Sequence, residues 1–255
     1  LVDQGIDHIT LSGGEPLCYD GLWDFVYFIA FKHNHINISI ITSAPKCEDK
    51  NSFIEKCVRY GIKNISISLP GISTFNSHTA TDETINSASN VLNWIRSASE
   101  KGIHVTTNIP VSQHNYAELY RIVAMAAIAG TNSLLITRFV PGGRGLKNSH
   151  NLYLTHSQLN EMLDLLDDFC SCTNISVAMG TEIPLCLIDN DKKYSHVSIS
   201  SACGAAKRFF VIDPSGYVRV CNHSPHIVGG INNPEIITDI SYWENFANQN
   251  YLPNE

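Results

Sequence analysis

The residues best suited to chemistry lie near the N-terminus, where Gly13-Gly14-Glu15-Pro16 follows the run Ile9-Thr10-Leu11-Ser12. Two adjacent glycines let the backbone turn sharply at the end of a strand and approach a ligand closely. The Glu15 carboxylate can accept hydrogen bonds from a bound ammonium, while Pro16 fixes the backbone and removes a competing N–H donor. A glycine-rich turn between a strand and a helix also occurs without any ligand. The motif alone therefore leaves a binding turn and a plain connecting turn open.

Two cysteines form the second candidate site. Cys203 and Cys221 flank the apolar segments 209–212 and 217–220, which are joined by Asp213-Pro214-Ser215-Gly216. Proline at the second turn position and a closing glycine predict a β-hairpin. Because a hairpin returns the chain beside its start, both thiolates can reach one zinc or iron–sulfur centre, although such a centre takes four ligands. Two buried thiols on a hairpin are the alternative.

The chain carries eight cysteines and shows no secretory signal, so we expect reduced thiols or metal ligands rather than disulfides. Five of the other cysteines fall on predicted helices or helix ends and are interpreted as buried or incidental thiols: Cys18, Cys47, Cys57, Cys170 and Cys172. Cys186 follows Pro184 closely and fits either interpretation.

Strand and helix patterns alternate along the chain and position these candidates. Strands are predicted at residues 8–12, 37–42, 64–69, 104–109, 133–140 and 175–178. Helices are predicted between them at residues 22–32, 52–60, 85–101, 117–129 and 157–169. Repeated strand–helix units of this kind predict an α/β fold with a parallel sheet. Ligands of such folds bind at the carboxyl ends of the strands, where Glu15, residues 42–43, residues 68–69 and Asn108 would meet.

Composition narrows the class of protein. The 255 residues, 44% of them hydrophobic, suffice for one large domain with a small appendage. A net charge of -7 with only 17 Lys and Arg residues argues against a nucleic-acid surface. No apolar run approaches the roughly 18 residues that span a bilayer, and the first residues do not show the pattern of a signal peptide. We therefore expect a soluble, cytoplasmic protein without a membrane partner.

Two further expectations concern organisation. The alternating pattern ends near Ile183, and residues 189–201 are polar and loop-like, which predicts a domain at 1–182 and a smaller one at 183–255. The first residues resemble the end of a helix with Gly5 as its C-cap, which predicts a fragment that lacks an N-terminal part. The polar C-terminal end predicts a similar cut there.

The order of these motifs resembles the radical S-adenosylmethionine (radical SAM) superfamily. Gly13-Gly14-Glu15-Pro16, residues 66–71 and residues 138–145 carry that resemblance, and Cys203, Gly216 and Cys221 are spaced as at the start of the SPASM extension of peptide-modifying members. It implies a partial (β/α)6 TIM-like barrel in which a [4Fe-4S] cluster binds S-adenosylmethionine. Reduction would cleave this cofactor to a 5'-deoxyadenosyl radical that abstracts hydrogen from a substrate.

The resemblance also implies roles for individual residues. Gly13, Gly14 and Glu15, with Pro16 behind them, would hold the methionine amino group, and Ser68 would contact polar atoms of the cofactor. The further cofactor candidates are Thr42 and Ser43 and, for backbone contacts to adenine, Ile136. Cys203 and Cys221 would ligate an auxiliary [4Fe-4S] cluster.

The chain departs from the family at three places. The Cys-x3-Cys-x2-Cys loop of the radical-generating cluster is absent, so the fragment alone is expected not to cleave S-adenosylmethionine. Pro70 replaces a frequent aspartate, and residues 78–82 lack the usual arginine. Asn222 stands where sulfatase-maturing members carry aspartate.

For the whole enzyme, the resemblance implies a ribosomally made peptide as substrate and an electron donor such as flavodoxin or ferredoxin. A tetrapyrrole or another small molecule is the alternative substrate. The alternative to an enzyme is a non-catalytic binding protein that keeps the barrel and has lost the cluster. Arg144 either binds a substrate carboxylate or is a solvated loop arginine.

Overall fold

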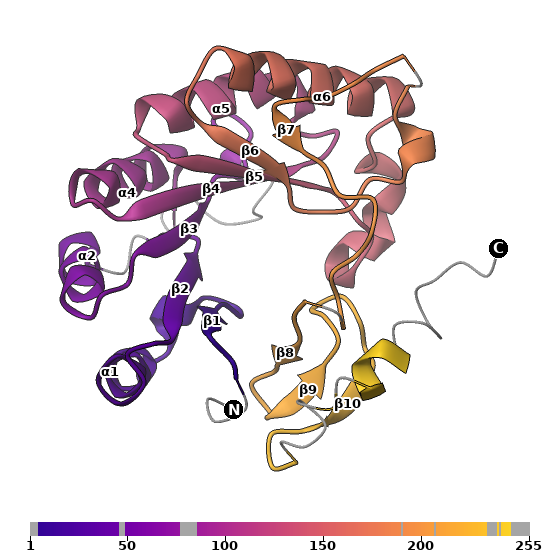
Figure 1. Cartoon of the computed structure of the whole chain (residues 1–255). Helices are drawn as coiled ribbons and strands as arrows, with labels where there is room; N and C mark the ends of the chain where they lie inside the picture. Colours follow the sequence, from indigo (N-terminus) through magenta and orange to yellow (C-terminus); the bar gives the residue numbers. More distant parts are fainter. Residues whose placement is uncertain are drawn as a thin grey trace. The chain divides into compact units, whose positions relative to one another are not determined.

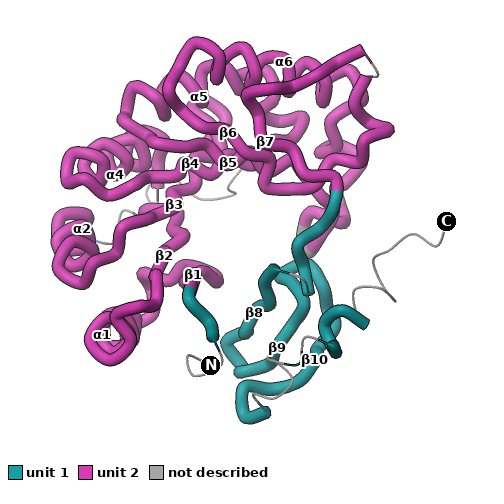
Figure 2. Tube along the Cα trace, in the orientation of Figure 1, with its two compact units in different colours: residues 1–7, 202–255 teal, residues 8–201 magenta. Residues whose placement is uncertain are grey.

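The computed structural model describes residues 5–45, 49–76, 86–189, 191–206, 208–233, 239 and 241–245. The chain divides into two compact units, one of His8–Ser201 and one of Leu1–Asp7 with Ala202–Glu255 (Figure 2). The expected helix end at residues 1–4, Cys47, the start of the predicted helix at residue 85 and residues 78–82 all lie outside the described residues.

A seven-stranded parallel sheet forms the larger unit (Figure 1). Its strands are β1 (His8–Leu11), β2 (Asn37–Thr42), β3 (Asn64–Ser68), β4 (His104–Val111), β5 (Ser133–Arg138), β6 (Ser176–Met179) and β7 (Val197–Ser198). They are ordered in space as in the sequence, and each neighbouring pair is parallel. All described carboxyl ends therefore lie along one edge, which is the edge where parallel α/β folds bind ligands.

Within the described residues, α-helices lie between successive strands of the sheet from β1 to β6. They are α1 (Leu22–Lys32), α2 (Lys50–Arg59), α4 (Ala88–Glu100), α5 (Leu119–Ile128) and α6 (His156–Ser171). Figure 1 shows them along one side of the curved sheet, as expected when every crossover returns in the same sense. The predicted α/β class with a partial TIM-like barrel is confirmed, and the described sheet is open at β1 and β7. No helix that the structure describes is long and apolar enough to cross a membrane.

The two faces of the strands differ in chemistry. In β3, Ile65 and Ile67 are almost fully buried, and they alternate with the half-buried Ser66 and Ser68. The core between sheet and helices contains Trp94, whose ring lies 5.2 Å from that of Phe53. The opposite face is therefore the polar one, and it leads to the carboxyl edge of the sheet.

Some elements differ from the sequence-based expectation. Residues 189–201 were expected to be loop, but Val197 and Ser198 pair with β6 as β7. The helix expected at 117–129 begins as the short 3-10 helix η3 (Tyr116–Glu118) before α5. Because β7 belongs to the sheet, the compact unit ends at Ser201, later than the boundary expected after residue 182. The assignment of domains 1–182 and 183–255 stays a prediction.

The smaller unit contains an antiparallel sheet with the order β10-β9-β8. Its strands are β8 (Val211–Ile212), β9 (Tyr217–Arg219) and β10 (Ile227–Gly230). The predicted hairpin is present: Gly216 N–H donates to the Asp213 carbonyl at 2.9 Å, and Gly216 adopts φ +80°. Side chains from this hairpin pack with Trp243 in a small core of their own.

Candidate cofactor site

The Gly-Gly-Glu-Pro turn begins directly after β1. Gly13 adopts φ +127°, a conformation that strongly favours glycine. Glu15 then caps the 3-10 helix η2 (Pro16–Cys18), and its Oε1 accepts from Leu17 N–H at 3.3 Å. Pro16 occupies the first position of this helix, where its missing N–H costs nothing. The turn thus fixes the backbone on both sides of the Glu15 carboxylate.

Side chains from the end of β2 hold the same carboxylate. Thr42 Oγ1 donates to Glu15 Oε1 at 2.7 Å. Ser43 donates to Glu15 Oε2 twice, from its backbone N–H at 2.8 Å and from its hydroxyl at 2.6 Å. The structure therefore brings together Glu15, Thr42 and Ser43 at the carboxyl ends of two neighbouring strands.

The two hydroxyl residues have different roles. Thr42 is 2% exposed, and its Oγ1 also accepts from Ala44 N–H at 2.9 Å. Thr42 is thus committed to contacts within the chain and positions Glu15. Ser43 is exposed beside the same carboxylate, so its hydroxyl is the one that a ligand can reach.

Two asparagines support this turn, and the sequence analysis missed both. Ala44 adopts φ +54°, an unfavourable conformation for a residue with a side chain. Asn86 Nδ2 donates to the Ser43 carbonyl at 2.6 Å, and Asn90 Nδ2 donates to the Ala44 carbonyl at 2.8 Å. Nothing in the local sequence identifies them, because they lie 43 and 46 residues from their partners.

The space beside Glu15 is open. A methyl group placed on Gly13 or Gly14 would meet no heavy atom of the described residues within 4 Å. A half-buried carboxylate next to an open glycine turn suits a ligand ammonium, because charge-assisted hydrogen bonds are the strong ones. The residues of this turn thus fit the amino group of an amino-acid-like cofactor.

Ser68 and Ile136 lie on different faces of the sheet. Ser68 ends β3 on the polar face, opposite Asn108 of β4. On that face of β3, the buried Ser66 Oγ has no hydrogen-bond partner among the described residues, which leaves a polar atom to be satisfied there. Ile136 is fully buried, and its carbonyl accepts from Gly180 N–H at 2.7 Å. No hydrogen bond within the described residues joins Ser68 or Ile136 to Glu15.

A second carboxylate fixes the loop that follows Ser68. Glu118 accepts from the backbone N–H groups of Ile72, Ser73 and Thr74, each at 3.0 Å, and from the hydroxyls of Ser73 and Thr74. Desolvation by burial raises the pKa of Glu118, but these hydrogen bonds outweigh it and lower the pKa from 4.5 to about 2. Glu118 therefore stays ionised and clamps the loop.

The Radical SAM superfamily model matches residues 1–126, which include the Gly-Gly-Glu-Pro turn, β3 and Glu118. The chain contains a radical SAM domain. The match begins ahead of Gly13 and extends into α5, so the radical SAM domain contains the whole Glu15, Thr42 and Ser43 constellation.

Comparisons with individual proteins show similarities in sequence and in fold. The chain is 25% identical over 158 residues to the pre-heme d1 synthase of Dinoroseobacter shibae, a match that covers 62% of this chain and 37% of that protein. Streptococcus suis SuiB bound to S-adenosylmethionine has a similar fold, with a TM-score of 0.69, 11% identity and coverage of 96% of this chain and 58% of that one. AnSMEcpe bound to AdoMet and the Kp18Cys peptide gives a TM-score of 0.67 at 16% identity, covering 96% and 70%. At such identities the two structures show the fold alone.

The two cysteines of the predicted auxiliary site belong to the smaller unit, outside the residues that the family model matches. Cys203 precedes the hairpin and is exposed, with its Sγ accepting from Ala205 N–H at 3.4 Å, and Cys221 follows β9 and is half-buried. Among the described residues, no group of three or more His, Cys, Asp or Glu side chains could hold a metal ion. The described residues thus offer at most two of the four ligands that an iron–sulfur cluster takes.

Proposed function

We propose that this chain is the cofactor-binding core of an enzyme that cleaves S-adenosylmethionine reductively to a 5'-deoxyadenosyl radical for hydrogen abstraction. The observation that supports this proposal is the Glu15 carboxylate, held by Thr42 and Ser43 at the carboxyl edge of a radical SAM domain. We propose peptide maturation as the purpose, because SuiB and anSMEcpe, whose folds are similar, have been solved with peptides bound.

When bound, S-adenosylmethionine would supply the radical chemistry, and this chain would bind and orient it. Gly13 and Gly14 leave room for the methionine end, and Glu15 would accept hydrogen bonds from its ammonium. The Ser43 hydroxyl can rotate away from Oε2 while its backbone N–H keeps the carboxylate in place. Ser68 would contact polar atoms of the cofactor from β3, and Ile136 would contribute backbone contacts to its adenine.

The decisive experiment measures S-adenosylmethionine affinity in the complete, cluster-loaded protein. Replacing Glu15 with Ala removes the acceptor for the ammonium and should weaken binding roughly tenfold or more, since hydrogen bonds to charged groups are worth ~1.5–3 kcal/mol. Glu55→Ala is the matched control, because Glu55 is an exposed glutamate on α2. An unchanged affinity in the Glu15 variant would remove the role proposed for this turn.

A tetrapyrrole or another small molecule is the second candidate substrate. It is favoured by the 25% identity to pre-heme d1 synthase, the enzyme named for a haem precursor. Incubating the complete protein with a peptide substrate or a porphyrinoid, and following 5'-deoxyadenosine release, separates the two. A binding protein without a cluster would release no 5'-deoxyadenosine with either.

We further propose that Cys203 and Cys221 ligate an auxiliary [4Fe-4S] cluster with ligands from beyond the described residues. An electron donor such as flavodoxin or ferredoxin is the partner that reductive cleavage requires. Iron quantification in the complete protein tests the first of these points. Loss of about four irons per chain in the Cys203→Ala variant, with the Cys172→Ala control unaffected, is the outcome that a [4Fe-4S] ligand predicts.

A further inference from the structure

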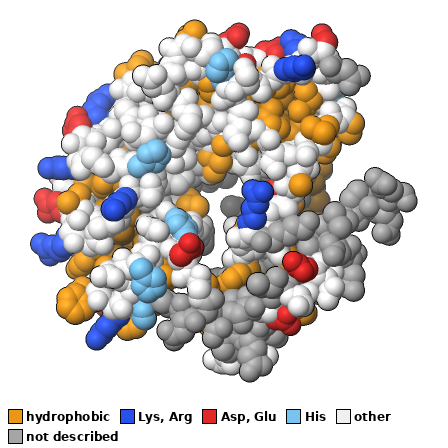
Figure 3. All heavy atoms as spheres, in the orientation of Figure 1, with side chains coloured by type: hydrophobic (Ala, Val, Ile, Leu, Met, Phe, Trp, Pro, Cys, Tyr) orange, Lys and Arg blue, Asp and Glu red, His pale blue; other side chains and the backbone are white. Residues whose placement is uncertain are grey.

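A cavity of about 220 Å³ lies at the carboxyl end of β5, on the same edge of the sheet as Glu15. It is lined by Arg138, Phe139, Tyr153, Leu154, Thr155, His156, Leu159 and Leu187. Figure 3 shows hydrophobic side chains gathered on the upper right of the molecule, around the start of α6 and the short helix η5 (Leu185–Leu187). The volume suits one side-chain-sized group and falls below the ~300 Å³ of a site for a whole drug-sized ligand.

Arg138 carries a permanent positive charge, whereas His156 in the same lining is charged only when it is protonated. Its Nε and Nη2 donate to the Glu182 carbonyl at 3.2 and 2.8 Å, which orients the guanidinium. Two of its five N–H groups are used in this way. Among the residues that the structure describes, no carboxylate lies within 4 Å of the Arg138 side chain. The half-buried guanidinium thus has a fixed orientation and no anionic partner among the described side chains, which do not include that of Arg144.

The walls of the cavity are aromatic and aliphatic. The Phe139 ring packs against Tyr153 with 5.5 Å between ring centroids and an angle of 75°. A methyl group on Gly145 would lie 2.8 Å from the Phe139 ring, so the glycine leaves the room that this ring needs. Apolar walls lower the local dielectric constant, and a carboxylate that reached Arg138 would be bound more strongly there than in water.

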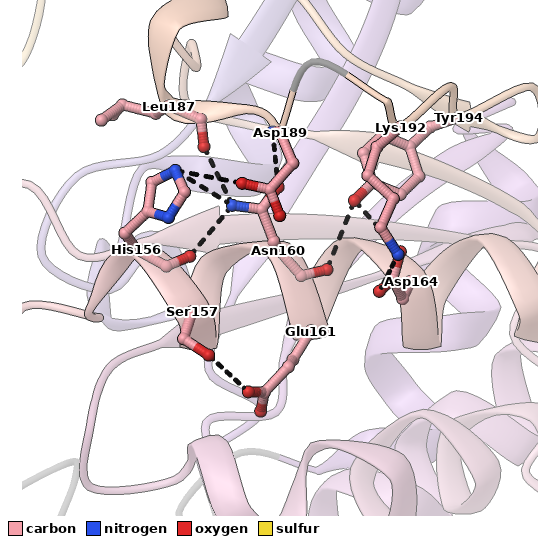
Figure 4. A network of polar contacts seen from close by, with 9 residues as sticks. All are labelled: His156, Ser157, Asn160, Glu161, Asp164, Leu187, Asp189, Lys192 and Tyr194. Carbon is pink, nitrogen blue, oxygen red and sulfur yellow. Dashed lines mark hydrogen bonds and ion pairs between the residues drawn. The ribbon is translucent and has the colours of Figure 1, made fainter.

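The first turn of α6 contributes to the same wall. Thr155 caps this 16-residue helix, and helix N-termini favour negative charge. Figure 4 shows how Asn160 ties the neighbouring segment to α6: its Nδ2 donates to the Leu187 carbonyl at 3.1 Å, and its Oδ1 accepts from Asp189 N–H at 3.0 Å. The Asp189 carboxylate faces His156 Nε2 at 3.5 Å. It does not neutralise Arg138.

We propose that Arg138 and this cavity form a subsite for one carboxylate of the substrate, carried on a short apolar arm. The inference rests on the proposed function, because it assigns the cavity to the substrate of that reaction. Arg138 would bind the carboxylate through its remaining N–H groups, and Phe139, Tyr153 and Leu187 would enclose the methylene groups. An acidic residue of a peptide and a propionate of a tetrapyrrole share this chemistry.

Nuclear magnetic resonance of the complete, 15N-labelled protein tests the subsite without S-adenosylmethionine or a cluster. The Arg138 Nε–Hε signal, assigned from its loss in Arg138→Gln, is followed during titration with two probes. One is the capped peptide Ala-Ala-Glu-Ala-Ala, with its Gln analogue as control, and the other is coproporphyrin. We expect one or both carboxylate probes to shift the signal in a saturable way and the Gln peptide to leave it unchanged.

Isothermal titration calorimetry measures probe binding to the variants, since Arg138→Gln lacks the Arg138 signal. Arg138→Gln should weaken binding roughly tenfold or more, as expected for a lost hydrogen bond to a charged group. Arg121→Gln, which alters an exposed arginine on α5, should leave it unchanged. A response to the peptide alone indicates that the carboxylate belongs to a peptide substrate. A response to coproporphyrin alone indicates that it belongs to a small-molecule substrate. If neither probe shifts the wild-type signal at about 10 mM, or if Arg138→Gln binds equally well, the subsite does not exist.

The test remains informative if Arg138→Gln fails to fold, because the wild-type signal is observed directly and Arg138→Lys provides a second assignment. It is also independent of the proposed cofactor role. Loss of S-adenosylmethionine binding in Glu15→Ala concerns the cofactor turn, whereas the Arg138 titration concerns the substrate side.

Discussion

Glu15 and Glu118 both gather N–H and hydroxyl donors from a loop that follows a strand of the same sheet. Glu15 accepts from Leu17, Thr42 and Ser43, and the glycines beside it face open space. Glu118 accepts five hydrogen bonds from residues 72–74. A methyl group on Gly71 would lie 2.9 Å from Glu118 Oε1 and 3.0 Å from Phe75 N, so this loop has no spare room.

The difference separates a binding carboxylate from a structural one. Both are satisfied by hydrogen bonds, so the number of partners alone does not identify a functional residue. The open approach past Gly13 and Gly14 makes Glu15 accessible to a ligand, whereas Glu118 is enclosed by the loop that it holds. Substitutions at the two sites should therefore separate stability from cofactor binding.

The largest loss of stability is expected for Glu118→Ala. Three backbone N–H groups and two hydroxyls would lose their acceptor, which should lower the free energy of unfolding by about 2–3 kcal/mol. Urea unfolding followed by circular dichroism measures this, with Glu100→Ala, an exposed glutamate at the end of α4, as the control. Glu15→Ala should cost less stability than Glu118→Ala, and an equal or larger loss would contradict the comparison.

The next largest expected effect is a pH dependence of stability that arises from Glu118. Its pKa is about 2 in the folded chain against an ordinary 4.5, so the unfolded state binds more protons between these values. The stabilisation is therefore complete above about pH 4.5 and is lost as the pH falls toward 2. Urea midpoints measured at pH 6 and pH 3.5 should fall further in the wild type than in Glu118→Gln, and equal falls would exclude Glu118 as the source.

The fold followed from the sequence wherever the signal was local. α1 and β2 begin and end at the predicted residues because apolar periodicity determines both. β7 was not predicted, since a two-residue strand has no periodicity and forms only by pairing with β6.

The candidate site was predictable in part, for the same reason. Gly13-Gly14-Glu15-Pro16 is a contiguous signal, and the contacts of Glu15 with Thr42 and Ser43 follow from two adjacent parallel strands. Glu118 has no such signal, because it lies 44–46 residues after the loop that it clamps. Long-range partners of this kind are set by tertiary packing, which a single sequence does not encode locally.

A smaller loss of stability, about 1–2 kcal/mol, is expected for Gly71→Ala, because the added methyl group must push against the Thr74 hydroxyl, the Glu118 carboxylate and the Phe75 backbone N. The same substitution in the Glu118→Ala background should cost less, since one of the crowding groups is gone. A double-mutant cycle of urea unfolding measures this coupling. If the stability losses of Gly71→Ala and Glu118→Ala simply add, Gly71 and the Glu118 hydrogen bonds act independently.

The last expected effect concerns the ligand, because Gly13→Ala should weaken cofactor binding as well as stability. Its backbone adopts φ +127°, so alanine is strained by about 1–3 kcal/mol, but no atom of the described residues lies within 4 Å of the added methyl group. In the complete protein, that methyl group would enter the space proposed for the methionine end. The loss of S-adenosylmethionine affinity should therefore be larger than the loss of stability, measured by the urea midpoint, can explain. For Gly71→Ala we expect the reverse, a loss of stability with little loss of affinity. If Gly13→Ala binds S-adenosylmethionine as the wild type does, the open space beside Glu15 does not receive the cofactor.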